Sequence, residues 1–292
     1  MTARLALGTA QFGLDYGITN TAGRVPAGTV SAILEEARLH GINMLDTAAL
    51  YGASEEALGQ QNLDGFDLVT KTPRFATAEI VSEQVDELIQ VFRRSRERLH
   101  RQSLYGLLSH HVNDLLAPGG ERLWVAMQEL KAAGDVERIG ASVYEGQQID
   151  ALLDRFSPDL IQLPVNVLDQ RLVNGRYIET LKERGVEVHA RSVFLQGLLL
   201  MQPENTPGYF APLRPLLRRY REVAAEQGLT PTQAALAYVR DLPGIDMVVV
   251  GVTDRAQLCQ CAEDFAQTRH FAGTGLACDD PSFVNPALWR LT

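Results

Sequence analysis

The chain has 292 residues, of which 27 are lysine or arginine and 36 are aspartate or glutamate, so its formal net charge is −9. This acidic balance, without a run of five basic residues, argues against nucleic acid as the main partner. The amino terminus lacks the apolar core of a signal peptide, and no apolar stretch approaches the length of a membrane span, so we expect no membrane partner.

One unit recurs along the chain: an apolar run, a helix with apolar residues at helical spacing, and a terminating glycine. The nearly continuous apolar runs are typical of parallel strands buried on both faces. Eight strands are predicted, at Leu5 to Gly8, Ile42 to Asp46, Asp67 to Lys71, Ser103 to Ser109, Arg138 to Ser142, Leu160 to Pro164, Glu187 to Ser192 and Met247 to Gly251.

The predicted helices have recognisable ends. Glycine is expected to end four of them, because it adopts a left-handed conformation without steric cost. Thr230 can cap the helix that follows it, with Pro231 at the first position and Gln233 as its reciprocal partner. The four terminating glycines are Gly41, Gly134, Gly185 and Gly228.

Eight strands alternating with helices in a chain of this length favour a (β/α)8 TIM barrel. A doubly wound open sheet has the same local signals and is the alternative. No linker or low-complexity segment divides the chain, so we expect a single domain over residues 1–292. Cys259, Cys261 and Cys278 indicate reduced thiols in the cytoplasm, and we expect no metal site from them.

Proton-handling side chains stand at three successive strand ends. Asp46 and Lys71 end two predicted strands, and His110 directly follows a third, with Tyr51 on the loop after Asp46. The active site of a parallel barrel lies at the carboxyl ends of its strands, so these side chains are expected to meet. Each alone could be structural, and His111 competes with His110 for its role.

This set, in this order, resembles the catalytic residues of the aldo-keto reductases. The segment from Gly41 to Gly52 carries the most specific likeness, and the resemblance covers almost the whole chain. It implies reversible hydride transfer between a nicotinamide and an aldehyde, ketone or sugar carbonyl. Tyr51 would be the general acid and base, His110 would orient the carbonyl, and Asp46 would hold Lys71 charged. Lys71 in turn would lower the pKa of Tyr51.

The same resemblance implies a nicotinamide site. Thr9 lies in the segment that resembles the family's first strand and loop, while Ser142 and Gln162 match the residues that contact the carboxamide. Arg191, followed by Ser192, occupies the place of an aromatic residue that stacks on the nicotinamide, and a guanidinium plane can also stack. Val143 replaces the usual asparagine, which removes one polar contact.

The cofactor's adenosine end departs from the family pattern. Gly251 and Gln257 stand where a lysine and an arginine are expected, and Cys261 replaces an asparagine. What remains is a helix start with amides near Gly251, Val252 and Thr253, and Arg255 as the only cation within reach. We expect NADPH, on family habit, with NADH as a second possibility.

Two segments are predicted to shape the substrate mouth: the loop from Leu198 to Phe210 and the tail from Phe271 to Thr292, with Phe283 and Trp289. These aromatic residues could instead pack on outer helices. The substrate and the oligomeric state, a monomer or a small homo-oligomer, stay open.

Three other functions would require different sequence features or a different activity. A nucleotide-bound regulatory protein of the same fold would show little turnover. A metal-dependent hydrolase would need several histidine and carboxylate ligands at the strand ends, where only His110, His111 and Asp46 are available. A serine hydrolase would need a nucleophile elbow, and the segment around Ser142 lacks its second glycine.

Overall fold

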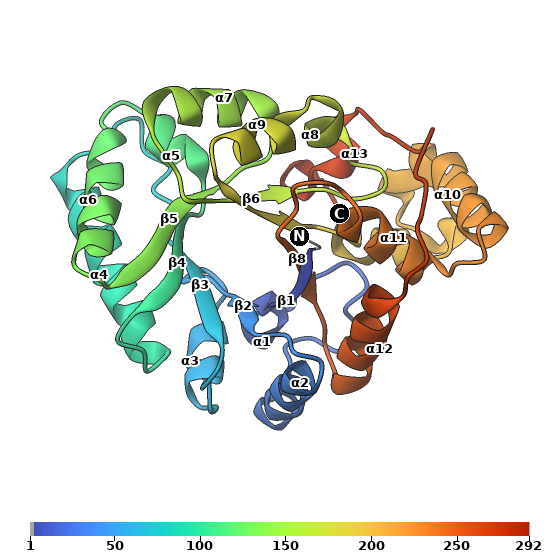
Figure 1. Ribbon diagram of the computed structural model, residues 1–292, viewed down its shortest axis with the longest axis horizontal. Coiled ribbons are helices and arrows are strands. Elements are labelled where there is room, and N and C mark those ends of the chain that lie inside the picture. The colour runs from blue at the N-terminus through green and yellow to red at the C-terminus, as the bar shows by residue number, and fades with distance from the viewer. Residues whose placement is uncertain (1–2, 292) are drawn as a thin grey trace.

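The computed structural model describes residues 3–291 and contains a closed barrel of eight parallel strands with helices outside it (Figure 1). Each strand pairs with the next along the chain, and the last pairs with the first. The strands are β1 (Arg4–Gly8), β2 (Met44–Asp46), β3 (Asp67–Lys71), β4 (Leu104–Ser109), β5 (Val136–Ser142), β6 (Leu160–Pro164), β7 (Glu187–Arg191) and β8 (Met247–Gly251).

The closure of the barrel settles the choice between the two predicted folds. Strand β1 pairs with β8 over five residues, from Arg4 opposite Met247 to Gly8 opposite Gly251. An open doubly wound sheet would leave those two strands unpaired with each other. The predicted TIM barrel is therefore confirmed.

Helices fill the connections between the strands. Two long helices, α10 and α11, lie between β7 and β8, while α2 and α12 pack against each other beside β1 and β8 (Figure 1). The helices are α1 (Ala10–Gly13), α2 (Ala27–Leu39), α3 (Ser54–Gly59), α4 (Ser82–Arg98), α5 (Val112–Leu116), α6 (Glu121–Ala132), α7 (Gly146–Arg155), α8 (Arg171–Asn174), α9 (Tyr177–Glu183), α10 (Arg214–Glu226), α11 (Pro231–Arg240), α12 (Arg255–Ala266) and α13 (Pro281–Val284). Four short 3₁₀ segments accompany them: η1 (Leu195–Leu200), η2 (Pro203–Asn205), η3 (Gly208–Leu213) and η4 (Pro286–Leu288). Within residues 3–291, no helix combines the length and apolar character needed to cross a bilayer.

The predicted ends of the elements are largely correct. Three strands have the predicted bounds, while β2 begins at Met44 and not at Ile42, and Ser192 falls just outside β7. All four terminating glycines have positive φ, between +67° and +79°. Thr230 also caps α11 as expected, because its hydroxyl accepts from the Gln233 amide while the Gln233 side chain accepts from the Thr230 amide.

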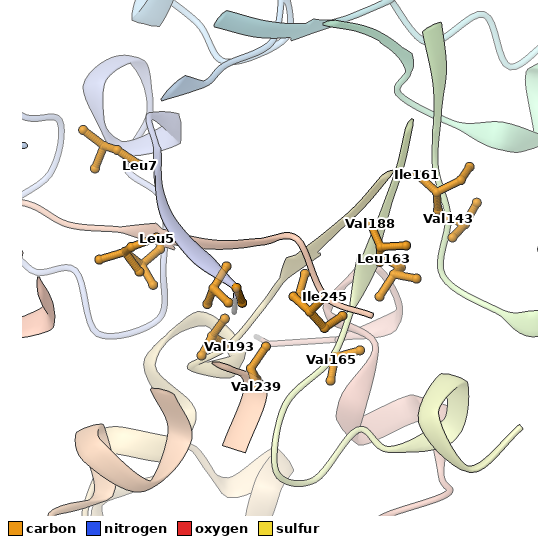
Figure 2. Close-up of a cluster of buried hydrophobic side chains, with 14 of the residues drawn as sticks. Leu5, Leu7, Val143, Ile161, Leu163, Val165, Val188, Val193, Val239 and Ile245 are labelled. Atoms are coloured by element: carbon orange, nitrogen blue, oxygen red, sulfur yellow. The ribbon is translucent and has the colours of Figure 1, made fainter. Parts of the chain in front are cut away.

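Successive residues along each strand face two different apolar layers, one outside the barrel and one inside it. Leu5 and Leu7 of β1, and Ile161 and Leu163 of β6, belong to the large cluster between the barrel and its helices (Figure 2). The residues between them face the other way, as the two-residue period of a strand requires. This second cluster fills the barrel and consists of Ala6, Met44, Val69, Leu108, Leu160, Met247 and Val249, with Tyr105 packed against it.

The interior layer determines where the polar side chains emerge. Asp46 lies two residues after Met44, Lys71 two after Val69, and His110 two after Leu108. Since residues two apart on a strand share a face, each polar side chain continues an inward-facing row at its carboxyl end. The barrel thus places Asp46, Lys71 and His110 close together, at the carboxyl ends of three neighbouring strands.

Candidate active site

A buried ion pair forms the base of the site. The Lys71 ammonium donates to both carboxylate oxygens of Asp46, at 2.7 and 2.8 Å, and to the Thr47 carbonyl at 2.9 Å. Gln162 of β6 donates to the same Asp46 carboxylate at 2.7 Å. Lys71 is 1% exposed and Asp46 4%. The three protons of the ammonium are therefore all used, and both carboxylate oxygens have partners.

Tyr51 and His110 lie directly against this pair. The Lys71 nitrogen is 4.9 Å from the centre of the Tyr51 ring, and the His110 ring meets the same tyrosine edge-on at 5.7 Å. His110 Nδ1 is buried and has no hydrogen-bond partner among the described residues. His111 stacks on the outer side of His110, with ring centres 5.1 Å apart, and does not line the cavity. The structure thus brings together the four side chains that the sequence singled out.

The electrostatics of Tyr51 differ from the expectation. Burial, and next the Asp46 charge, raise the pKa of the Tyr51 phenol, while Arg191 lowers it. The decrease predicted from Lys71 is therefore absent, because burial and the Asp46 charge dominate. Burial, with the nearby Lys71 charge, also lowers the pKa of His110 to about 2. The site therefore holds a protonated phenol and a neutral imidazole at neutral pH.

A cavity of about 470 Å³ opens from these residues toward β8 and α12. It is lined by polar residues of β5, β6 and β7 and by residues at the start of α12. Every predicted site residue except Arg255 lines it: Thr9, Asp46, Tyr51, Lys71, His110, Ser142, Gln162, Arg191, Ser192, Gly251, Val252, Thr253, Gln257 and Cys261.

Arg191 reaches across the carboxyl ends of the strands toward β5. Its guanidinium carbon lies 4.2 Å from the centre of the Tyr144 ring, and the group donates to the Val143 carbonyl at 3.1 Å and to the Ser192 hydroxyl at 3.2 Å. One face of the guanidinium is thus already covered by Tyr144. Arg191 and Tyr144 both line the cavity.

Arg255 is not where the sequence prediction needs it. Its Nε donates to Glu36 of α2 at 2.6 Å, and the side chain points away from the cavity. The start of α12 is also partly satisfied from within, because the Thr253 amide donates to the Gln257 side chain and the Gln257 amide to Asp254. The expected anion site at this helix start is therefore weaker than the sequence indicated.

The loop after α1 is the main part of the site that sequence reasoning missed. Tyr16, Gly17, Thr19 and Asn20 all line the cavity. This loop is held against the loop after β7, since the Ile18 amide donates to the Gln196 carbonyl at 3.1 Å. A Cβ added at Gly197 would lie 2.2 Å from the Thr19 hydroxyl oxygen, so the two loops touch closely. The position of the loop, after the first strand and on the catalytic face, was the available signal.

The two predicted mouth segments contribute unequally. Leu200, from the predicted loop, lines the cavity, but Tyr209 and Phe210 do not. Phe210 instead packs edge-on against Trp289 at 4.8 Å, and Tyr209 packs against Phe283 at 5.9 Å. No tail residue in the range 271–291 lines the cavity. Phe283 and Trp289 therefore pack against other aromatic side chains outside the cavity, as the alternative prediction proposed.

The metal-hydrolase alternative finds little support in this geometry, because Lys71 and Gln162 already occupy the Asp46 carboxylate. Within residues 3–291, the side chains grouped closely enough to hold a metal are Glu36, His40 and Cys259. Glu36 belongs to α2, His40 directly follows α2, and Cys259 belongs to α12. None of these three side chains lines the cavity.

Comparison with known proteins agrees with this arrangement. The model of the aldo/keto reductase family matches residues 4–268. An uncharacterized oxidoreductase of Mycobacterium tuberculosis is 29% identical over 290 residues, which cover 88% of this chain and 82% of the relative. Another, from Bacillus subtilis, is 26% identical over 176 residues, which cover 58% of this chain and 60% of the relative.

Solved structures share the fold. An aldo-keto reductase from Bacillus halodurans in its holo form superposes with a TM-score of 0.71 at 21% identity, covering 91% of this chain and 88% of the other. A glycerol dehydrogenase from Gluconobacter oxydans gives a TM-score of 0.69 at 19% identity, with coverages of 91% and 87%. Since the family model spans most of the chain, the protein belongs to the aldo/keto reductase family and is an oxidoreductase of that family.

Proposed function

We propose that the protein reduces an aldehyde, ketone or sugar carbonyl with a nicotinamide nucleotide, and that Tyr51 delivers the proton. One observation carries this proposal: Tyr51 and His110 line one cavity beside the buried Asp46–Lys71 pair. A protonated phenol suits the reductive direction, in which the carbonyl oxygen gains a proton as the carbon gains a hydride.

Each side chain then has a separate task. Neutral His110 donates a hydrogen bond to the carbonyl oxygen and fixes its direction relative to Tyr51. As the proton leaves, the phenolate that forms lies beside the Lys71 ammonium, which favours the charged product of the transfer. Asp46 and the Thr47 carbonyl hold that ammonium in place. In the oxidative direction the same groups act in reverse.

The cavity fits a nicotinamide nucleotide, which would supply the hydride when bound. Ser142 at the end of β5 and Gln162 in the middle of β6 both line the cavity, and the amide of Gln162 donates to Asp46. At the end of β8, a Cβ added to Gly251 would lie 2.6 Å from the Gln11 side chain. Glycine at this position therefore leaves room for the Gln11 side chain, which lines the cavity beside it.

The choice of nucleotide follows from Arg255. Recognition of a 2′-phosphate normally uses a basic side chain, because Arg and Lys make the strongest charge-assisted bonds to phosphate. Arg255 is instead paired with Glu36 at 2.6 Å, and Asp254 stands at the start of α12. NADH therefore binds about as well as NADPH. Titration of each nucleotide by protein fluorescence quenching checks this, and a preference for NADPH above about tenfold, roughly 1.4 kcal/mol, would refute it.

The test of the catalytic assignment is Tyr51→Phe, with Tyr177→Phe as the matched control. The Tyr177 hydroxyl contacts Asp150 on the outer helices and lies outside the cavity. Loss of the Tyr51 proton should lower kcat by about a hundredfold or more, because general acid catalysis typically contributes that much. The nucleotide dissociation constants should stay unchanged.

Three results would contradict parts of the proposal. Retention of more than a tenth of the turnover by Tyr51→Phe would remove the proton-donor role. Nucleotide binding without reduction of any carbonyl by the unaltered protein would favour a regulatory role for the same fold. Failure to bind either nucleotide would remove the reductase proposal altogether.

A further inference from the structure

The charges in the cavity do not balance. Among the described residues that line it, the carboxylate is Asp46 and the cations are Lys71 and Arg191. Lys71 and Asp46 neutralise each other at 2.7 Å. No carboxylate of residues 3–291 lies within ion-pair distance of Arg191. The cavity therefore carries one uncompensated positive charge.

The Arg191 side chain is fixed in place by neutral groups. Tyr144 covers one face of the guanidinium, and the Val143 carbonyl and the Ser192 hydroxyl each accept one hydrogen bond. A guanidinium has five N–H groups, so three of them have no acceptor in these contacts. A partly buried cation that is held rigidly and keeps free donors is suited to bind an oxyanion, because little side-chain entropy is lost on binding.

We propose, on the basis of the carbonyl reduction proposed above, that the substrate carries a carboxylate or phosphate a few bonds from its carbonyl and that Arg191 binds this group. Arg191 would then be the residue that determines substrate charge. A neutral sugar or alkyl aldehyde would leave the partly buried cation unpaired in the cavity, which disfavours such a substrate.

The position of Arg191 supports this assignment. Its positive charge acts on Tyr51 and on His110, lowering the pKa of each, so it stands near the reacting end of the cavity. The same charge lowers the pKa of Tyr16 on the opposite loop, against the dominant effect of burial, which raises it to about 12. Arg191 lines the same cavity as Tyr51, His110 and Tyr16, so an anion bound to it would share that cavity with the catalytic groups.

The other source of an oxyanion is the pyrophosphate of the nucleotide. The two sources are separated by measuring nucleotide affinity and substrate selectivity on the same variants. Arg191→Gln removes the charge, Arg191→Lys keeps it without the planar fork, and Arg122→Gln is a control on the exposed face of α6.

Two pairs of carbonyl compounds serve as probes: succinic semialdehyde with butanal, and D-glyceraldehyde 3-phosphate with D-glyceraldehyde. The unaltered enzyme should favour the charged member of at least one pair by about tenfold to a hundredfold in kcat/KM, as expected for a hydrogen bond to a charged group. Arg191→Gln should abolish that preference, measured as the ratio of kcat/KM between the charged and the neutral member at saturating nucleotide, so that any shared effect of the variant on the cofactor cancels. Both nucleotide dissociation constants are measured on the same variant. Arg191→Lys should restore part of the preference, and Arg122→Gln should behave like the unaltered enzyme.

Equal use of charged and neutral members by the unaltered enzyme would overturn the proposal. An equal loss on both members in Arg191→Gln, with weaker nucleotide binding, would also overturn it and assign Arg191 to the cofactor. If no carbonyl is reduced at all, the proposed reduction fails, and calorimetry with succinate and butane-1,4-diol on the nucleotide-bound protein decides the anion site separately. Binding of succinate that Arg191→Gln abolishes would sustain the site, and equal or absent binding of both compounds would refute it.

Discussion

Replacing Lys71 by Met leaves the buried Asp46 carboxylate without its cation. Gln162 would then be the remaining side chain that donates to it. The carboxylate can escape the isolated charge by taking up a proton. An aspartate of ordinary pKa, near 3.9, needs about 4 kcal/mol to be protonated at pH 7, which sets an upper limit on this loss of stability.

The complementary change, Asp46→Asn, leaves the Lys71 ammonium buried. A lysine of ordinary pKa, near 10.4, needs about 5 kcal/mol to become neutral at pH 7. Both limits agree with the roughly 3–5 kcal/mol that removal of one partner of a buried pair typically costs. The double variant has no unpaired charge, so it should lose about as much as one single variant and far less than their sum.

Urea unfolding at pH 7, followed by both far-UV circular dichroism and the fluorescence of Trp124 and Trp289, provides the measurement. For Lys71→Met the deficit should shrink at pH 5, because protonating Asp46 then requires about 3 kcal/mol less than at pH 7. A deficit below about 1 kcal/mol in either single variant, or additive losses in the double variant, would refute the argument that the pair is coupled and desolvated.

Two other predictions concern neighbouring features. The pKa of His110 is lowered to about 2, so below about pH 6.5 the unfolded chain gains a proton that the folded chain does not. The free energy of unfolding should therefore fall by up to about 2 kcal/mol between pH 7 and pH 5 through this group, and His110→Gln should remove that part of the loss in parallel urea titrations. Trp289→Ala should lower the free energy of unfolding by about 1–3 kcal/mol, through lost packing on Phe210 and a lost hydrogen bond to the Phe283 carbonyl. The kcat/KM of this variant across a substrate panel should stay unchanged. Altered substrate selectivity would instead show that the tail helps to shape the substrate mouth.

The sequence predicted the barrel and its catalytic face because both depend on short-range patterns. An apolar run that ends in Asp46, Lys71 or His110 combines a strand with the two-residue alternation that turns its last side chain inward. The order of such runs then places these side chains on neighbouring strands, since parallel strands align their carboxyl ends.

The errors arose where a partner lies far away in the chain. Arg255 looks free in the sequence, but Glu36 precedes it by 219 residues and meets it only where α2 packs on α12. The loop holding Tyr16 has no periodic pattern, and its shape depends on contact with Gln196. The predicted decrease in the pKa of Tyr51 is absent because burial and the Asp46 charge raise that pKa.

The pairing of β1 with β8 also has a consequence for biosynthesis. Gly8 and Gly251, one on each of these strands, are opposite each other and both line the cavity. A ribosome-bound chain that has not yet released residues near 251–261 lacks one wall of the cavity, however well its earlier strands have folded. Nucleotide binding therefore begins only after the last strand has closed the ring, so nucleotide-induced fluorescence quenching during refolding should report the final step of assembly.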